Sequence, residues 1–510
     1  MKKLYALNCP ELEKQLAKNY VNTKKLTVKT VLGGIILPVR DTKSVGVVSV
    51  YEGGLCDEKY NLVVGYRRRV GIGQNQFEIV RAYTPDVAPA YIDEDVIFAG
   101  IGFSHFGHFL LESLCRLWWV IKNKEFSKKI IFLKNIAFDE SKYSSLLELC
   151  GLDLDRVIYL EQPTQFKSVT VPDQSLMFFD YYTHEFITPY NKILENITAS
   201  NHKKIYLSRT KFIKQDHVNE IYFENFYRNL GYYIVYPEKI DIREQIALIA
   251  GADEIVSTMG TISHLAIFCK PKTKLITFLR SRNSISAVQL MINAVRDLDF
   301  SVVDVTINIL PSQYSTNCFF IGPTSSWRLF CKEHYQIDIQ EDMVSFLNSA
   351  NSHFGTYLKL WRDTYSKRTE FNKIKNHSMF NTMEQIDVTL SENTTSYETK
   401  ISQVMCIRDD PENLFALLKN KIFRFSHYDD AHPRHIFLKG DMSIVSLTER
   451  NYDNEVYWNI VDGQLVFQSK TKEITSRYAY LTVNDSVISS IGVFVKNPKI
   501  LFKLSSVHLA

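Results

Sequence analysis

The sequence of 510 residues lacks several features that define large classes of protein. It contains no uninterrupted apolar run of about 18 residues, the length that a membrane-spanning helix needs. Residues 1–14 contain no apolar stretch of signal-peptide length before charged residues return. Charges nearly balance, at 60 Lys and Arg against 56 Asp and Glu, which argues against a general surface for binding nucleic acid. We therefore expect a cytoplasmic protein, either free or associated peripherally with the inner face of the membrane.

Cysteine is present but follows no recognisable pattern. The eight cysteines form no CxxC pair, and no Cys and His residues have the spacing of a zinc site. Scattered cysteines of this kind favour reduced thiols over a disulfide scaffold. No structural metal is expected from them.

Length and composition predict about three domains, because 510 residues with 45% hydrophobic content exceed a single core. Residues 1–175 begin with short β-branched runs and continue as alternating strands and helices, which indicates an α/β unit. Residues 176–310 alternate regularly and predict a second α/β unit with a parallel, helix-covered sheet. Residues 311–395 are interpreted as a helical segment, with a helix over 341–368, followed by a linker over 382–399. Residues 396–510 predict an antiparallel sandwich or barrel, with Asp462-Gly463 as a hairpin turn.

A helix is predicted over residues 104–121, and its polar residues form one line. His105, His108, Glu112 and Arg116 are spaced three, four and four residues apart, so they lie on one side of a helix that is otherwise largely apolar. Burying four ionisable groups in register is costly unless the line borders a cleft. The alternative is a core helix whose polar groups are satisfied by neighbouring backbone. Four groups in register favour a functional site.

Two further clusters follow predicted strands of the second unit. Arg209 and Lys211 come directly after a strand over residues 204–208, at the edge where parallel sheets bind ligands. The guanidinium of Arg209 suits phosphate oxygens, although a structural ion pair is equally compatible with the sequence. Gly260 separates another strand from a helix, and such a turn offers backbone N–H groups to an anion. This turn is neither a Walker loop nor a GxGxxG motif, so other features have to support a nucleotide site there.

Residues 107–116, with the sequence Gly-His-Phe-Leu-Leu-Glu-Ser-Leu-Cys-Arg, resemble the GHxLxExLxR segment of glycosyltransferase family 61. The later run over residues 204–264 follows the same family element by element, and the similarity covers about residues 60–280. Cys115 and Leu265 depart from the family pattern, which has proline and asparagine there. A shorter similarity around Trp458 resembles a β module appended to bacterial polysaccharide transferases, so the chain looks like a bacterial member.

The resemblance implies a GT-B-like enzyme with two α/β domains and a small C-terminal β-rich accessory domain. It implies an inverting, metal-independent transferase without a cofactor, whose donor is a nucleotide sugar, expected to be UDP-linked. The acceptor would be an oligosaccharide or a lipid-linked glycan, in capsule or lipopolysaccharide synthesis. The second domain would hold the nucleotide, and the matching positions are Arg209, Lys211, Glu238, Gly260, Thr261, Ile262, Ser263 and His264.

Inversion needs a base to take the proton of the acceptor hydroxyl as it attacks the anomeric carbon. Glu112 is the first choice for this base, with His108 one turn away to orient it or to replace it. His105 and Arg116 are assigned to acceptor-binding or supporting roles. Arg116 is expected to pair either with Glu112 or with the phosphates.

Two alternatives belong to other classes of protein. Asp93-Glu94-Asp95 could be the metal clamp of a metal-dependent DxD transferase, because hard cations favour carboxylate oxygens. The C-terminal β unit could bind sugar through Trp458, which would make the chain a non-catalytic glycan-binding protein.

Overall fold

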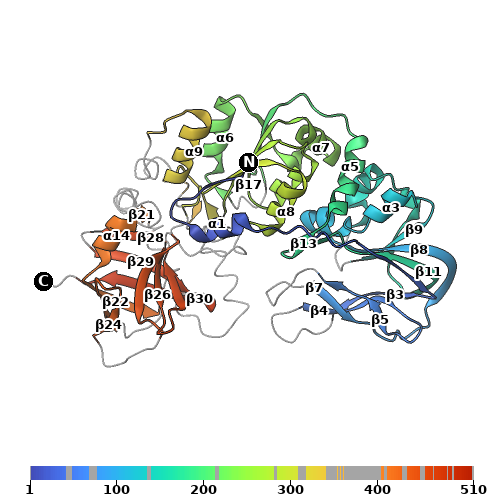
Figure 1. The fold of residues 1–510 in the computed structure, drawn as a ribbon, viewed down its shortest axis with the longest axis horizontal. Helices are drawn as coiled ribbons and strands as arrows, with labels where there is room; N and C mark the ends of the chain where they lie inside the picture. Colours follow the sequence, from blue (N-terminus) through green and yellow to red (C-terminus); the bar gives the residue numbers. More distant parts are fainter. Residues whose placement is uncertain are drawn as a thin grey trace.

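The computed structural model describes residues 2–41, 49–67, 77–134, 139–212, 217–280, 284–307, 318–340, 353, 356–357, 360, 404–406, 411–427, 434–447, 454–462, 464–478, 480–484 and 487–507. They form a mixed α/β part and a β-rich C-terminal part (Figure 1). Three predicted features fall wholly or mostly outside the described residues. They are the linker over 382–399, the turn residue Gly463, and the helix over 341–368, of which four positions are described. No helix in the described ranges combines the length and apolarity needed to cross a membrane.

A six-stranded parallel sheet forms the centre of the second α/β unit, as the regular alternation of strands and helices predicted. Its order is β1-β19-β18-β17-β14-β16, and every neighbouring pair is parallel. The strands are β1 (Lys2–Tyr5), β14 (Lys204–Leu207), β16 (Tyr233–Val235), β17 (Glu254–Thr258), β18 (Lys274–Phe278) and β19 (Asp299–Val303). Such sheets are covered by helices on both faces. These helices are α6 (Glu220–Asn229), α7 (Ile242–Gly251), the 3₁₀ helix η6 (Thr261–Phe268), α8 (Ala287–Val295) and α9 (Ser325–Tyr335).

Several of these helices begin at a side chain that caps them. Asp241, Ser286 and Thr324 each accept a hydrogen bond from the backbone N–H three residues later, at 2.9, 3.3 and 3.2 Å. Such caps satisfy N–H groups that have no partner inside the helix. They fix where α7, α8 and α9 start and therefore where the preceding loops end.

The strand β1 belongs to the sheet of the second unit, although it lies at the start of the chain. Lys2–Tyr5 pair with residues 300–303 of β19, and the ring of Tyr5 packs edge-on against Phe330 of α9 at 5.1 Å. The first strand of the chain therefore belongs to the second unit, although residues 1–175 were expected to form the first. The boundary between residues 175 and 176 stays a prediction.

The first unit is built on the long strand β8 (Ala90–Gly102), which pairs in parallel with β9 (Lys129–Lys134) and β11 (Thr164–Pro172). β10 (Val157–Leu160) extends this parallel part beside β9. Beyond β11 the sheet becomes a mainly antiparallel arm that carries Tyr66 toward the site described below. The arm comprises β2 (Val28–Leu32), β3 (Ile35–Asp41), β4 (Ser49–Cys56), β5 (Leu62–Val64), β6 (Tyr66–Arg67) and β7 (Phe77–Arg81).

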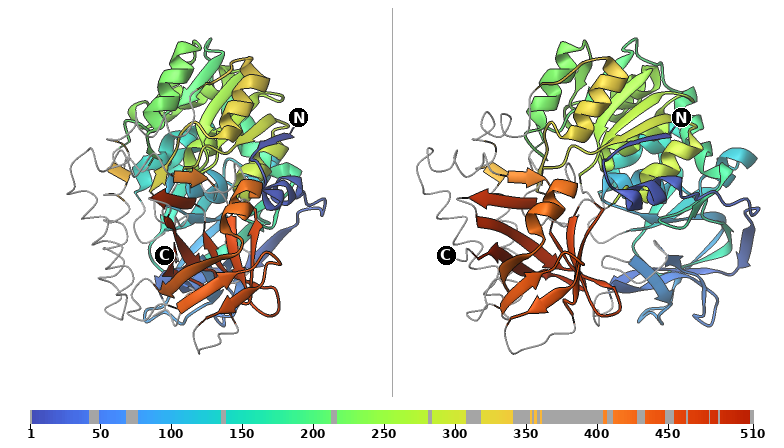
Figure 2. Two further views of the ribbon diagram at one scale, coloured as in Figure 1. Left: turned by 90° about the vertical axis from the view of Figure 1, so that its left-hand side faces the viewer. Right: turned by 60° about the vertical axis from the view of Figure 1, so that its left-hand side comes forward.

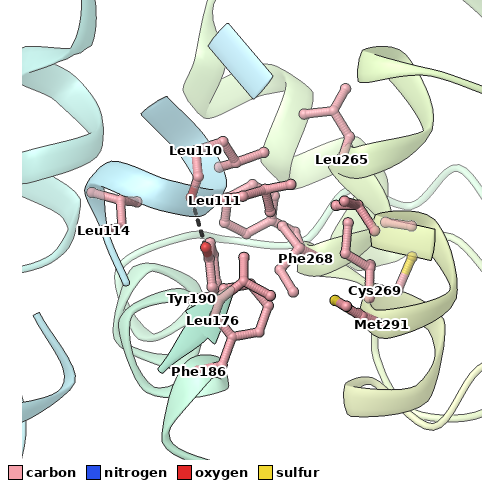
Figure 3. Packing of buried hydrophobic residues seen from close by; sticks show 14 of the residues in the cluster. Leu110, Leu111, Leu114, Leu176, Phe186, Tyr190, Leu265, Phe268, Cys269 and Met291 are labelled. Atoms are coloured by element: carbon pink, nitrogen blue, oxygen red, sulfur yellow. Dashed lines mark hydrogen bonds between the residues drawn. The ribbon is translucent and has the colours of Figure 1, made fainter. Parts of the chain in front are cut away.

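The two α/β units share one hydrophobic core. The buried cluster includes side chains from residues 109–120, from α4 (Ser144–Leu149) and α5 (Thr188–Glu195), and from η6 and α8. Figure 3 shows Leu110 and Leu111 against Phe268, and the Tyr190 hydroxyl donates a hydrogen bond to the Leu110 carbonyl at 2.6 Å. Burial of one such side chain is worth about 1.5–3 kcal/mol, so this core fastens the units together.

Figure 2 shows the C-terminal part as a β-rich body. Among the described residues, its hydrophobic core is formed by side chains from 414 to 504. Ten antiparallel strands form its sheet. Eight of them run in the order β24-β23-β22-β30-β29-β27-β26-β25, while β28 pairs with β29 and β21 pairs with β28. A bridge between Ser443 and Tyr457 links the two ends, so the sheet is nearly a closed barrel. The elements are β21 (Val404–Cys406), α14 (Pro411–Leu418), β22 (Lys421–His427), β23 (Arg434–Leu438), β24 (Ile444–Ser446), β25 (Tyr457–Val461), β26 (Gln464–Gln468), β27 (Ile474–Tyr478), β28 (Tyr480–Asn484), β29 (Val487–Phe494) and β30 (Asn497–Ser506).

The hairpin between β25 and β26 touches the N-terminal helix α1 (Pro10–Ala17). Val461 pairs with Gln464, as the predicted turn requires. The Asp462 carboxylate accepts a hydrogen bond from the backbone N–H of Glu11 at 3.4 Å, at the start of α1. This contact links the C-terminal part to the rim of the cavity described next.

Candidate active site

The helix predicted over residues 104–121 is interrupted in the structure. It consists of α2 (Phe106–His108), a π-helical turn η1 (Phe109–Ser113) and α3 (Trp118–Asn123). The Ser113 hydroxyl donates to the Ile101 carbonyl at 2.7 Å and accepts from the Phe103 N–H at 3.1 Å, which ties the π turn to β8. A π turn holds more residues than an α turn, so side chains beyond it leave the predicted line.

Glu112 lies behind His108 and is only 3% exposed. One carboxylate oxygen accepts a hydrogen bond from the Tyr66 hydroxyl at 2.8 Å, and the other contacts Nδ1 of His108. His108 lines the cavity, whereas Glu112 does not. If Glu112 were the base, its carboxylate would have to border the cavity. Instead His108 borders the cavity and Glu112 lies behind it.

When Glu112 is ionised and His108 neutral, the carboxylate can only accept hydrogen bonds, so Nδ1 of His108 is the donor between them. Nε2 of the neutral imidazole then carries a lone pair. The His108 side chain is 24% exposed, compared with 2% for Glu112. Of the two residues, His108 is the one that can take a proton from a ligand in the cavity.

Arg116 lies away from the cavity, which corrects both pairings expected for it. Its guanidinium donates to the Pro172 carbonyl, and burial lowers the pKa of Arg116. Its Nε lies 3.6 Å from the point that a Cβ at Gly100 would occupy. Arg116 thus fastens the turn after η1 to the end of β11. His105, by contrast, lines the cavity with its ring 5.1 Å from that of His108.

Three neighbouring strands of the second sheet end beside the cavity. β18, β17 and β14 are adjacent and parallel, so their carboxyl ends lie at one edge of the sheet. Arg209 follows β14, Gly260 follows β17, and Arg280 follows β18. Both arginines line the cavity, on either side of the Gly260 turn. An anion bound at this edge would meet two guanidinium groups.

Arg280 was not predicted from the sequence, although it has the same position relative to its strand as Arg209. Each arginine stands two residues after the end of a parallel strand. The Arg280 guanidinium lies 4.3 Å from the centre of the Phe319 ring and donates to the Met259 carbonyl at 3.1 Å. Gly260 has φ +135°, and a Cβ there would overlap Nη1 of Arg280. Glycine is favoured at this turn because L-residues rarely adopt φ +135°, and the absence of a Cβ leaves that space to the guanidinium.

The expected backbone site at the Gly260 turn is partly used within the turn itself. The Gly260 N–H donates to the Ser263 hydroxyl at 3.2 Å, and the Ser263 N–H donates to the Gly260 carbonyl at 3.0 Å. The N–H groups of Thr261 and Ile262 remain as candidates, and both residues line the cavity. Glu238 also lines it, whereas Lys211 is exposed and does not.

His264 is the buried polar group that stands out in the cavity wall. Within the described residues neither ring nitrogen has a hydrogen-bond partner, and both nitrogens are buried although the residue as a whole is only partly so. Burial lowers the pKa of His264 to about 3, with further contributions from His108, His105 and Arg280. A neutral imidazole at this place can donate or accept one hydrogen bond to a ligand.

The two units meet at Gly107. A Cβ at Gly107 would lie 3.1 Å from Cγ2 of Thr261 and 3.4 Å from Nδ1 of His264. This close approach brings His108 on the first unit next to the η6 turn on the second. The cavity that both border has a volume of about 1680 Å³. That exceeds the roughly 300–1,000 Å³ of a site for one drug-sized ligand, so there is room for two substrates.

The acidic triplet proposed for a metal-dependent enzyme lies elsewhere. Asp93 and Glu94 pair with Lys167 and Lys129, and Asp95 accepts from the Ser168 hydroxyl. These three residues do not line the cavity. The described residues contain no cluster of three or more His, Cys, Asp or Glu side chains that could hold a metal ion.

Residues 106–276 match the family model Glycosyltransferase 61. This segment is a family 61 glycosyltransferase domain. The chain is therefore a glycosyltransferase, and the family in general uses a nucleotide-sugar donor and a glycan acceptor. The matched segment includes His108, Glu112 and the η6 turn, whereas Arg280 follows it. A comparison with curated proteins gives no match.

Proposed function

We propose that this family 61 glycosyltransferase moves a sugar from a nucleotide sugar to a glycan hydroxyl in one displacement, with inversion and without a metal ion. The observation that carries the proposal is the arrangement of the cavity. His108, backed by Glu112, borders it on one unit, and Arg209, Arg280 and the η6 turn border it on the other.

The second unit supplies groups that suit a diphosphate. Arg209 and Arg280 offer two charged sets of donors, and charge-assisted hydrogen bonds of this kind are the stronger ones. The N–H groups of Thr261 and Ile262 add backbone donors at the start of η6. His264 would donate or accept one hydrogen bond as a neutral group. We assign the donor, expected to be UDP-linked, to this side of the cavity.

The first unit supplies the base. As the acceptor oxygen attacks the anomeric carbon, its proton passes to Nε2 of His108, and the bond from that carbon to the diphosphate oxygen breaks with its electron pair. Glu112 stabilises the imidazolium that forms, and Tyr66 holds Glu112. The departing diphosphate gathers negative charge, which Arg209 and Arg280 offset.

The finer aspects of the proposal come from the family resemblance and the layout of the chain. A GT-B-like pair of domains is supported by two α/β units that border one cavity, with a parallel sheet on the donor side. An oligosaccharide or lipid-linked acceptor in capsule or lipopolysaccharide synthesis, at the inner membrane face, is proposed from the resemblance alone.

Turnover of nucleotide sugars with and without EDTA tests this proposal. The expected result is nucleotide release from one of a panel of nucleotide sugars, at the same rate in EDTA. Loss of turnover in EDTA would favour a metal-dependent transferase. No turnover of any donor, with glycan binding retained, would favour the non-catalytic alternative.

A further inference from the structure

A short hairpin beside His108 holds an aromatic residue in a conformation that costs free energy. β12 (Leu176–Met177) and β13 (Tyr181–Tyr182) are joined by a turn that the Asp180 N–H closes on the Met177 carbonyl at 3.2 Å. Phe179 has φ +66° in this turn. Turns of this kind normally place glycine at such a position, because a bulky side chain is strained there.

The same residue is exposed. Phe179 is 43% exposed and lines the cavity, whereas its neighbour Phe178 is 5% exposed. Backbone strain of this type clusters at functional sites, where it positions a side chain for a ligand.

The hairpin is anchored rather than loosely attached. The Tyr182 N–H donates to the Tyr20 carbonyl at 2.9 Å, and the Asn22 N–H donates to the Tyr182 carbonyl at 2.8 Å. The Tyr181 hydroxyl donates to the Gln174 carbonyl at 3.1 Å. These bonds fix β13, and pairing with β13 fixes β12, so the turn between them presents Phe179 in a defined place.

Phe178 and Phe179 form a corner next to the proposed base. The Phe178 ring lies 5.6 Å from the His108 ring, at an interplanar angle of 34°. Phe179 stands nearly perpendicular to Phe178, at 6.4 Å and 88°. A sugar whose hydroxyl reaches Nε2 of His108 therefore has its ring close to these aromatic rings.

We propose that Phe179 is a stacking platform for the ring of the acceptor sugar. The C–H groups on one face of a pyranose carry partial positive charge and pack against the negative face of an aromatic ring. A platform held rigidly also lowers the entropy lost on binding. The proposal deepens the proposed function and rests on it, because it places the acceptor beside His108 and the donor beside Arg209 and Arg280.

Saturation-transfer NMR with a panel of methyl pyranosides, in the presence of UDP, tests this inference on the full chain. We expect at least one pyranoside to bind, with saturation concentrated on the C–H protons of one face. Phe179→Gly should weaken that binding by about tenfold or more, which corresponds to about 1.4 kcal/mol. It should fold, because glycine adopts φ +66° without strain.

Two further variants sharpen the test. Phe179→Trp keeps an aromatic face and should bind the pyranoside within about threefold of wild type, by the same stacking. Tyr60→Gly replaces another aromatic residue at positive φ, +59°, that does not line the cavity, and should leave binding unchanged. Hydrolysis of the nucleotide sugar by water should be the same in Tyr60→Gly as in wild type.

Failure of this inference is distinguishable from failure of the proposed function. No pyranoside binding to wild type, or equal binding by Phe179→Gly, would overturn the stacking platform while donor hydrolysis continued. Loss of donor hydrolysis in Phe179→Gly would also overturn it, because Phe179 would then serve the donor side. Absence of hydrolysis in wild type would instead contradict the transferase assignment.

Discussion

Replacing Glu112 with glutamine separates the two roles assigned to Glu112 and His108. The substitution keeps the shape but leaves one acceptor oxygen for two donors, the Tyr66 hydroxyl and Nδ1 of His108. It also removes the charge that stabilises the imidazolium. A hydrogen bond to a charged group is worth about 1.5–3 kcal/mol, so we expect transfer to fall by about 10–150-fold.

His108→Ala should cost more, because it removes the base itself rather than its partner. General base catalysis contributes about 10²–10⁴ in rate, and the loss should fall in that range. Nucleotide affinity should stay at the wild-type level in both variants, since the diphosphate site lies on the second unit. Added imidazole should restore part of the activity of His108→Ala and none of that of Glu112→Gln.

Initial rates at saturating donor and acceptor, together with calorimetry of nucleotide binding, provide the measurement. Tyr66→Phe is the matched control, because it removes one hydrogen bond to Glu112 and keeps the carboxylate, so its loss should be smaller than that of Glu112→Gln. If Glu112→Gln is slower than His108→Ala, and imidazole rescues neither, Glu112 is the base and the geometric reasoning is wrong.

Three other predictions concern the donor site, the pH dependence and the C-terminal part. Arg209→Ala and Arg280→Ala should each weaken binding of the nucleoside diphosphate by about 1.5–3 kcal/mol in calorimetry, whereas Lys211→Ala should not; equal affinities would remove both arginines from the site. The pKa of His264 is about 3 in the folded protein and near 6.5 in the unfolded chain. Between pH 6.5 and 3 the unfolded chain therefore binds one more proton at this residue, and the free energy of unfolding decreases as the pH is lowered. Between pH 6.5 and 5, wild type should lose about 1–2 kcal/mol more than His264→Gln in denaturant titrations, and parallel curves would contradict this. A chain ending at Asn393 should fold and bind nucleotide, because the C-terminal core is separate; an insoluble product would show that the contact of Asp462 with α1 is essential.

The second sheet could be predicted from sequence because its signals are local. The strands β14, β16, β17, β18 and β19 each lie within a few residues of a predicted strand, because each is a short apolar run in a regular alternation of strands and helices. β1 was missed because its pairing joins residues 2–5 with residues 300–303. The local pattern of hydrophobic residues does not indicate which distant strand a short strand will pair with.

In the candidate site, too, local contacts could be predicted from the sequence and long-range ones could not. The contact between His108 and Glu112 was predictable, since residues four apart stay neighbours in both α and π turns. The position of Arg116 was not, because the π turn depends on the bonds of Ser113 to the strand β8. Which member of the pair borders the cavity depends on Tyr66, from a strand far away in sequence. Lys211 was expected at the nucleotide because it follows a strand, yet its side chain is exposed outside the cavity.

The central claim is that one base activates the acceptor hydroxyl for direct displacement at the anomeric carbon. The configuration of the product formed in the first minutes of reaction, read by ¹H NMR from the coupling of the anomeric proton, tests it most directly. A single displacement with His108 as base predicts a product of inverted configuration relative to the donor. A product with retained configuration would contradict the account, because retention by two displacements requires a nucleophile that forms a bond to the sugar.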